Sequence, residues 1–258
     1  MNLRSFFPVI LLAASVATVS YGQDLPDPPL TDYSQDFEGL TLAGDVPVNE
    51  EPGFDALSSD GWMVAGSNFF GTPDAFGEFN FFFGNFPAPN YAQNDGFSGV
   101  VANQGTGGQG LQHLNVFTDF GERVAHDGVD NVLDARVFQE QTIGAADLGE
   151  TVSFEFEFKR NFENNTDDFG PNGNTQTFAF VRVLNSLDTT FATLAETNIE
   201  TTSAELSTWT QGEAELFIDP TFEGQLLQFG FFSVSQNNYN SGIVYDNLVF
   251  SALSLIHI

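Results

Sequence analysis

The alternation of apolar and polar positions is clearest in residues 151–160, TVSFEFEFKR, where Val and Phe alternate with Ser and Glu. A period of two predicts a β-strand with one buried and one solvated face. Similar segments, separated by Gly, Asn and Asp, occupy residues 59–66, 110–117, 135–143, 175–184, 208–218, 225–234 and 242–250. The pattern therefore predicts a series of short antiparallel strands.

No segment shows a long helical period, and only residues 145–150 could form a single turn. Many short strands over about 220 residues favour an all-β fold, a jelly-roll β-sandwich of two antiparallel sheets. Its core is predicted to bury the phenylalanines of two strands, Phe154, Phe156, Phe158, Phe229 and Phe231.

Two segments are predicted to be loops. Residues 69–99 are rich in Phe, Gly and Pro and long for a connection, which favours a functional loop or a packed flap. Residues 161–175 are predicted to form an acidic turn between two strands.

The two ends of the chain differ in composition from its middle. Residues 1–22 have the basic start, apolar stretch and small-residue cleavage motif of a secretory signal peptide. We expect 23–32 to be a leader, 33–251 to be the sandwich, and 252–258 to lie outside the core. The last six residues, LSLIHI, match a translated sequencing adapter, so this tail is predicted to be non-native.

Acidic residues dominate the composition, with 35 Asp and Glu against 6 Lys and Arg. Such a surface repels phosphate backbones, so no nucleic-acid partner is expected, whereas divalent cations are attracted. The chain has no Cys, so its stability must come from a large core or a bound metal. The 30 Phe residues favour an aromatic β core.

Asp246 interrupts an apolar strand near the end of the chain. Strict alternation would place it on the same face as Val244, Leu248 and Phe250. A lone carboxylate there would cost several kcal/mol, an order of magnitude that requires a partner. Two kinds of partner remain open from the sequence: a metal ion, or one of the basic residues Arg136, Lys159 and Arg182.

Several motifs occur in a recognisable order: DFEG, DGW, VFQEQTI, GETVSFEFEFKR, TWTQGEAEL and GIVYDNLVF. In this order they resemble the galactose-binding-like jelly-roll carbohydrate-binding modules of exported bacterial polysaccharide-degrading systems. They are also similar to exported proteins of marine bacteria that carry the same series. The resemblance covers about residues 33–251, and it implies the fold more specifically than the ligand.

The resemblance also implies a structural calcium ion where the first and last strands meet. It assigns Glu38 and Asp246 as carboxylate ligands, with Asp36 as a third candidate that could instead face solvent. Ca²⁺ prefers six to eight oxygen ligands, which agrees with carboxylates on rigid strands. An acidic, exported chain without Cys would gain folding free energy from the ion.

Catalytic motifs are not evident in the sequence. Glu155 and Glu157 are the nearest match to a glycosidase acid pair, but they fit the solvated face of an ordinary strand better. His126 lies beside Asp127 and Asp130, which suggests a solvated turn more than a metal loop. No nucleophile elbow, zinc-protease motif or phosphate loop is present.

A sugar site needs aromatic rings for stacking and amide or charged groups for hydroxyls. The predicted ligand-binding residues are Gln139, Gln141, Arg136, Tyr91, Tyr239 and Asn237, with Phe86, Asn238 and His113 as further candidates. Gln139 and Gln141 share one face of their strand, although neighbouring strands could satisfy both amides. Trp62 and Trp209 are expected to pack in the core.

Three functions agree with these features. The first is an exported, non-catalytic module that holds calcium and binds a polysaccharide or cell-surface glycan. The second is an acidic adhesion or matrix protein with a missing C-terminal sorting segment. The third is a polysaccharide lyase or hydrolase with an unrecognised site. No membrane span is expected, because the apolar stretch of the signal is short and no stop-transfer segment follows it.

Overall fold

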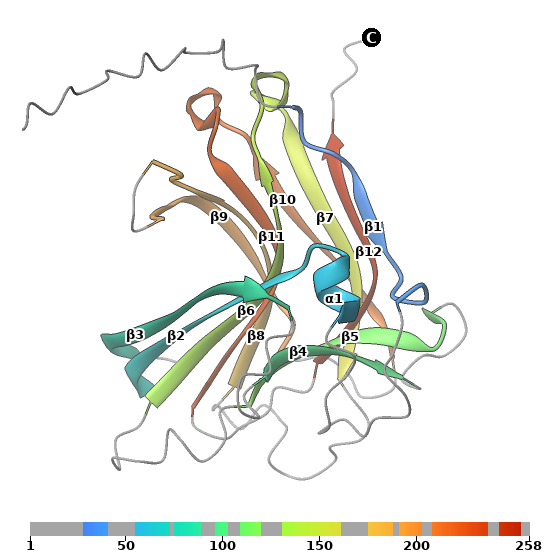
Figure 1. Cartoon of the computed structure of the whole chain (residues 1–258), viewed down its shortest axis with the longest axis vertical. Coiled ribbons are helices and arrows are strands. Elements are labelled where there is room, and N and C mark those ends of the chain that lie inside the picture. Colours follow the sequence, from blue (N-terminus) through green and yellow to red (C-terminus); the bar gives the residue numbers. More distant parts are fainter. Residues whose placement is uncertain are drawn as a thin grey trace, which may run out of the picture.

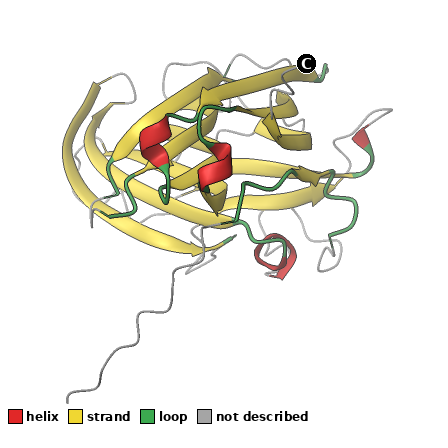
Figure 2. Cartoon of the chain, turned by 90° about the horizontal axis from the view of Figure 1, so that it is seen from above, coloured by secondary structure: helices red, strands yellow, loops and turns green. Residues whose placement is uncertain are grey.

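The computed structural model describes residues 28–40, 55–72, 75–88, 96–102, 109–119, 131–160, 175–187, 191–202, 208–236 and 243–253. Within these residues, two antiparallel sheets of six strands each pack face to face (Figures 1 and 2). The predicted all-β sandwich is confirmed. None of the described helices is long and apolar enough to cross a membrane.

Sheet A contains the first and last strands of the described chain. Its order is β10-β7-β12-β5-β4, and β1 pairs with β12 beside this path. The strands are β1 (Tyr33–Gln35), β4 (Gly96–Ala102), β5 (Gln112–Asp119), β7 (Thr151–Arg160), β10 (Thr210–Phe217) and β12 (Ile243–Leu253). The termini of the sandwich therefore meet on one sheet, at the right of Figure 1.

Sheet B has the order β3-β2-β6-β11-β8-β9. Its strands are β2 (Met63–Thr72), β3 (Ala75–Pro87), β6 (Asn131–Thr142), β8 (Thr175–Leu184), β9 (Thr193–Glu200) and β11 (Leu226–Gln236). Among the described residues, the short elements include helix α1 (Asp55–Ser59) and the 3-10 turns Ala145–Asp147 and Pro220–Phe222. The first of these turns lies where the sequence allowed one.

The core lies between the sheets and is rich in stacked aromatic rings. Phe229 of sheet B stacks on Phe250 of sheet A with centroids 4.1 Å apart, and Phe231 stacks on Tyr245 at 3.6 Å. All five phenylalanines predicted to be core residues are buried: Phe154, Phe156, Phe158, Phe229 and Phe231. Burying each such ring stabilises the fold by about 1.5–3 kcal/mol.

The described part of the Phe-rich segment forms strands rather than a loop, which corrects the prediction for residues 69–99; residues 73–74 and 89–95 lie outside the described residues. Its residues complete β2, form all of β3 and begin β4, with Thr72 pairing with Ala75 across a tight reversal. Aromatic residues favour a pleated sheet, and this preference outweighs the Gly and Pro content of the segment. The predicted acidic turn at 161–175 lies, apart from Thr175, outside the described residues.

The end of the leader belongs to the sandwich, contrary to expectation. Leu30 is buried in the core, and its backbone N–H donates to both carboxylate oxygens of Asp147, at 3.1 and 3.0 Å. The Thr31 backbone N–H donates to Gln141 Oε1, and Gln141 Nε2 donates to the Thr31 carbonyl, as the backbone of a paired strand would. A buried carboxylate and an amide thus anchor the backbone ahead of β1.

The tryptophans differ from each other. Trp62 is fully buried, as predicted, and its Nε1–H donates to the Tyr33 hydroxyl at 2.9 Å. Trp209 is only partly buried and lies outside both core clusters, so its core assignment is wrong. Its neighbour Thr210 pairs with Phe158, which places Trp209 beside Lys159, and the Lys159 ammonium lies over its ring.

Candidate functional site

A β-bulge determines which way Asp246 faces. Asn247 has a left-handed backbone with φ of 49°, and the pairing of β12 with β7 shifts between Asp246 and Val249. Leu248 and Phe250 therefore belong to the core cluster, whereas Asp246 faces the outer side of sheet A. The sequence prediction that Asp246 shares the core face is wrong, because one extra residue inverts the alternation.

The nearest ionisable partner of Asp246 is His113 of β5, not one of the basic residues that the sequence suggested. The His113 Nδ1 atom lies 3.4 Å from Asp246 Oδ2, and both side chains are almost completely buried. Asp246 Oδ1 accepts a hydrogen bond from the backbone N–H of Asn247. Burial raises the pKa of the Asp246 carboxyl, and His113 offsets this only in part.

Several buried atoms around this pair lack hydrogen-bond partners among the described residues. They include both ring nitrogens of His113, Oδ2 of Asp246, Oε1 of Gln112 and Oδ1 of Asn115. His113 and Asp246 are in ion-pair contact but are not hydrogen-bonded to each other. An unpaired buried polar atom costs about 1–3 kcal/mol, so this cluster is poorly satisfied by protein groups alone.

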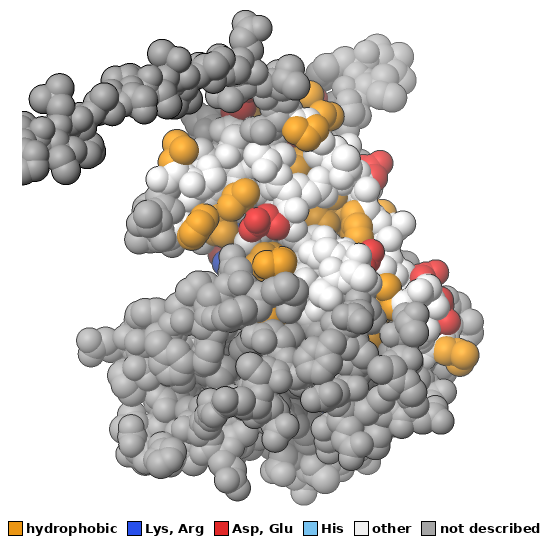
Figure 3. Space-filling view, viewed as in Figure 1, with side chains coloured by type: hydrophobic (Ala, Val, Ile, Leu, Met, Phe, Trp, Pro, Cys, Tyr) orange, Lys and Arg blue, Asp and Glu red, His pale blue; other side chains and the backbone are white. Residues whose placement is uncertain are grey.

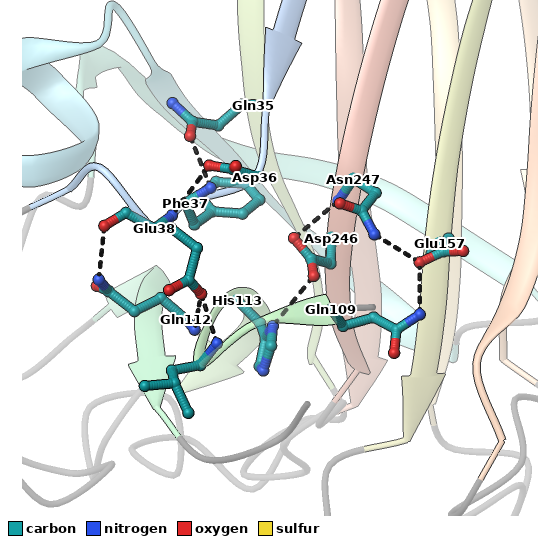
Figure 4. A network of polar contacts seen from close by, with 11 residues as sticks. Gln35, Asp36, Phe37, Glu38, Gln109, Gln112, His113, Glu157, Asp246 and Asn247 are labelled. Carbon is teal, nitrogen blue, oxygen red and sulfur yellow. Dashed lines mark hydrogen bonds and ion pairs between the residues drawn. The ribbon is translucent and has the colours of Figure 1, made fainter. Parts of the chain in front are cut away.

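Glu38 belongs to a second set of polar contacts near this pair, and no drawn contact joins the two sets (Figure 4). Its Oε1 accepts from the backbone N–H groups of Leu111 and Gln112, and the Gln112 side chain donates back to the Glu38 carbonyl at 3.1 Å. Asp36 is exposed, and its Oδ1 accepts from the Glu38 backbone N–H at 3.1 Å. Asp36 thus shapes the turn that presents Glu38.

Glu157 of β7 is opposite Asp246 and completes the network. Its Oε2 accepts from the side-chain amides of Gln109 and Asn247, each at 2.8 Å. The described residues contain no group of three His, Cys, Asp or Glu side chains placed to hold a metal ion. Asp246 and Glu157 occupy paired positions on β12 and β7, so an oxygen-preferring ion beside them would need backbone carbonyls or water to complete its shell.

The outer face of sheet B carries a connected row of polar side chains. Glu140, Gln228 and Arg182 occupy paired positions on β6, β11 and β8. Gln228 donates through Nε2 to Glu140 at 2.6 Å and accepts through Oε1 from Nε and Nη2 of Arg182 at 2.8 and 2.6 Å. We call these three residues the polar row.

Arg136 lies on the same outer face and reaches across it from β6. Its guanidinium pairs with Asp134 at 3.0 Å and with Glu196 of β9 at 3.2 Å. Burial alone would lower the pKa of Arg136, but the two carboxylates outweigh it and raise that pKa. Arg136 is therefore held in a neutralised, charge-assisted cluster.

Aromatic rings form a layer beneath these charges. Phe178 and Phe232 stack with centroids 4.7 Å apart, and the Arg136 guanidinium lies 4.4 Å from the centroid of Phe232. Phe180 lies beneath both arginines, at 5.2 Å from each guanidinium carbon. With Phe138 and their neighbours, these residues form a second apolar cluster, separate from the main core.

No side chain stands on β11 in the middle of this face. Gly230 pairs with both Phe138 and Phe180, and a Cβ there would come within 2.2 Å of the Val137 carbonyl oxygen. Only glycine fits at that point.

The acidic side chains on the described surface in Figure 3 stand out singly among apolar and uncharged groups.

The predicted sugar-binding residues lie in different places in the structure. Gln139 donates to the Asp60 carbonyl at 2.7 Å and Gln141 bonds the backbone of Thr31, so both amides serve the fold and their predicted ligand role is not supported. Arg136 does lie on an outer face. Tyr91, Asn237, Asn238 and Tyr239 lie outside the described residues, and so does the side chain of Phe86.

None of the three residues of the polar row was predicted from the sequence to bind a ligand. Glu140 stands between Gln139 and Gln141, on the opposite face of the same strand. Gln228 and Arg182 are single polar residues within the apolar stretches LLQFGFF and FAFVRVL. The signal that could have found them is the one that pointed to Asp246: a polar side chain that interrupts a buried strand.

The predicted solvated strand face is partly confirmed. Glu155 is exposed, whereas Glu157 is half-buried and hydrogen-bonded. The loop around His126 lies outside the described residues.

No protein-family model matches the sequence, and no curated protein does either. Among solved structures, a cyclase from Fischerella sp. TAU is similar at TM-score 0.43 and 12% identity, over 88% of this chain and 96% of that one. A family 22 carbohydrate-binding module of Clostridium thermocellum Xyn10B is similar at TM-score 0.36 and 11% identity, over 85% and 92%.

A CBM22-1–GH10 xylanase chain from the same bacterium is similar at TM-score 0.33 and 13% identity over 74% of this chain. The present chain spans only 26% of that xylanase chain. Other similar solved structures include further carbohydrate-binding modules, among them a CBM22-1 xylan-binding domain, TmCBM61 and a CBM4.

Proposed function

We propose that the outer face of sheet B binds a glycan without turning it over. The observation that carries this proposal is the polar row of Glu140, Gln228 and Arg182 beside the stacked rings of Phe178 and Phe232. Sugar hydroxyls need donors and acceptors held in fixed positions, and sugar ring faces pack on aromatic surfaces.

The sheet supports such a site well because its groups are held in place. Gln228 is almost completely buried and bonded on both sides, so the carboxylate and guanidinium that flank it have little freedom. Groups fixed before binding lose less entropy on binding. A row running across neighbouring strands would suit an extended chain of sugars.

The experiment is affinity electrophoresis of the full chain against neutral and acidic plant and algal polysaccharides. Phe178→Ala should weaken binding about tenfold, the order expected for one aromatic contact. Phe217→Ala, at an exposed ring on sheet A, is the matched control and should bind like the wild type.

Retardation by none of the polysaccharides would favour an adhesion or matrix role. Release of reducing ends or unsaturated products would instead show an enzyme. An equal loss in both Phe variants would place the site elsewhere.

We also infer a structural calcium ion near Asp246. The supporting observation is that Asp246 Oδ2 is buried without a hydrogen-bond partner among the described residues. Gln112 Oε1 also lacks one, on the residue that precedes His113 and contacts Glu38. Oxygen ligands of this kind suit Ca²⁺, whereas the nearby His113 nitrogens do not. Bound calcium would neutralise the carboxylates and add its binding free energy to the stability of the fold.

Export follows as a further proposal from residues 1–22. If the signal is cleaved before Gln23, the mature chain recovered outside the cell should begin at that residue. N-terminal sequencing of the exported chain tests it, and an intact Met1 in that fraction would contradict it.

A further inference from the structure

The two described arginines on the outer face of sheet B differ in how their charges are balanced. Arg136 contacts two carboxylates, Asp134 and Glu196. Arg182 contacts no carboxylate within 4 Å among the described residues; its hydrogen bonds go to the amide oxygen of Gln228. In a chain with 35 acidic residues, a guanidinium without a carboxylate partner needs an explanation.

The nearest acids are kept from Arg182 by other groups. Gln228 stands between Glu140 and Arg182, giving its N–H to the carboxylate and its oxygen to the guanidinium. Glu196 pairs with Arg182 in register across β8 and β9, yet its carboxylate is bonded to Arg136 instead. Both candidate partners are therefore already engaged.

The surrounding groups therefore balance only part of the positive charge of Arg182. Burial, followed by repulsion from Arg136, lowers the pKa of Arg182 to about 9, despite the attraction of the three nearby acids. The group remains a cation at neutral pH. An additional anion placed against it would be stabilised, because a guanidinium forms strong paired hydrogen bonds with planar oxyanions.

Two nitrogens of the Arg182 side chain, Nε and Nη2, donate hydrogen bonds, and both donate to the same oxygen, Oε1 of Gln228. No described residue accepts from Nη1, and this atom is not among the buried atoms without a partner. The guanidinium therefore retains donor capacity for a ligand. The ring of Phe180 supports its flat face, which fixes its plane.

We propose that Arg182 selects glycans that carry an oxyanion, either a carboxylate or a sulfate ester, on one of their sugars. The inference rests on the proposed glycan-binding function and specifies its ligand class. Glu140 and Phe178 would contact the neighbouring uncharged sugars, Gln228 would hold Glu140 and Arg182 in place beneath them, and Arg182 would bind the charged substituent.

The net charge of the chain limits how acidic that ligand can be. With a formal charge of −29, the protein repels a densely charged polymer at long range. Glu140 and Glu196 also lie close to the Arg182 guanidinium. These features favour a glycan with isolated anionic groups along an otherwise neutral chain, because one guanidinium can accommodate one oxyanion.

The test measures binding of the full chain by isothermal titration calorimetry to two matched pairs of polymers. One pair is a glucuronic-acid-substituted xylan and its carboxyl-reduced form, and the other is a sparsely sulfated galactan and its desulfated form. The wild type should prefer the charged member of one pair by about tenfold, and the pair that shows the preference identifies carboxylate or sulfate.

Arg182→Gln should remove that preference while leaving binding of the neutral member within about twofold, since the aromatic contacts remain. Arg182→Lys keeps the charge without the planar fork and should retain part of the preference. Arg160→Gln, on sheet A, changes the net charge equally and is the matched control. Thermal melts of each variant confirm that it is folded.

Equal wild-type binding to both members of both pairs would overturn the inference and leave the glycan-binding proposal intact. An equal loss for charged and neutral polymers in Arg182→Gln would also overturn it, because Arg182 would then act on the whole site. Binding to no polymer at all, with Phe178→Ala indistinguishable from wild type, would instead refute the proposed function.

Discussion

In the described part of the chain, buried polar groups on the outer face of sheet B have hydrogen-bond partners, whereas most of those on the outer face of sheet A lack them. On sheet B, Gln228 is bonded to both of its neighbours, and Arg136 pairs with two carboxylates. On sheet A, His113 and Asp246 are equally buried, but most of their polar atoms lack partners among the described residues. Sequence position alone does not distinguish the two cases, since each is a polar residue within an apolar strand.

The difference indicates what each face requires. A satisfied network forms a rigid surface that is ready to contact a ligand. An unsatisfied buried cluster loses about 1–3 kcal/mol for each orphan atom unless water or an ion supplies the missing contacts. The sheet B face is therefore a candidate for recognition, and the sheet A face a candidate for an ion that stabilises the fold.

Calcium removal is expected to have the largest effect. A chelator should lower the free energy of unfolding by about 2.7 kcal/mol relative to a hundredfold excess of Ca²⁺ over its dissociation constant. For a domain of this size that is roughly 5–10 °C in the melting temperature. Differential scanning calorimetry of the full chain measures it.

Asp246→Ala should abolish this calcium dependence. The matched control is Glu155→Ala, which removes an exposed acid from the same sheet and should retain it. A melting temperature that does not change with chelator would contradict the calcium proposal. It would show that the buried atoms of His113 and Asp246 without hydrogen-bond partners are tolerated in the absence of calcium.

Breaking the polar row should have the next largest effect. Gln228→Leu leaves the Glu140 carboxylate and the Arg182 guanidinium without their shared partner, at a cost of about 1–3 kcal/mol. Gln211→Leu, at an exposed position of sheet A, should change stability by less than about 0.5 kcal/mol. Urea unfolding distinguishes them, and equal midpoints would mean that the row contributes no net stability.

The pH dependence of stability should report the orphan carboxylate. Burial raises the folded-state pKa of Asp246, so its contribution is fully present below the unfolded pKa of about 3.9 and is lost as pH rises through the folded pKa. In chelator, Asp246→Asn should therefore become more stable relative to wild type as pH rises through this window.

Urea unfolding of both proteins across the acidic range measures that difference. Parallel stability curves would show that the Asp246 carboxyl ionises as easily in the folded state as in the unfolded chain. Repeating the series with Ca²⁺ should reverse the advantage of the Asn variant, because the ion favours the charged form.

The ion pair between Arg136 and Glu196 should give the smallest effect. Its side chains are 17% and 23% exposed, so solvent screens the attraction and Glu196→Gln should cost about 0.5 kcal/mol. The loss should shrink in high salt. A larger, salt-independent loss would indicate that Glu196 also positions Arg136 for the rest of the face.

Some features could be predicted from the sequence because they depend on local pattern. The strands at 151–160 and 175–184 match β7 and β8 residue for residue, since the core-facing positions, Val and Phe in β7 and Ala and Val in β8, repeat every second residue. Strand β9, with the mainly polar sequence TLAETNIE, was missed because an exposed edge strand needs no apolar face. The Phe-rich hairpin was missed because Gly and Pro suggested a loop.

What the sequence determined by itself is the alternating strands, the aromatic core, the acidic surface and the conflict posed by Asp246. The tertiary structure decided which face each polar interruption occupies and which groups meet there. A single bulge at Asn247 turned Asp246 away from the core, and strand order brought Glu140, Gln228 and Arg182 together from positions 42 to 88 residues apart. Alternation along one strand determines only which of its residues share a face. Pairing between distant strands determines which residues become neighbours on that face.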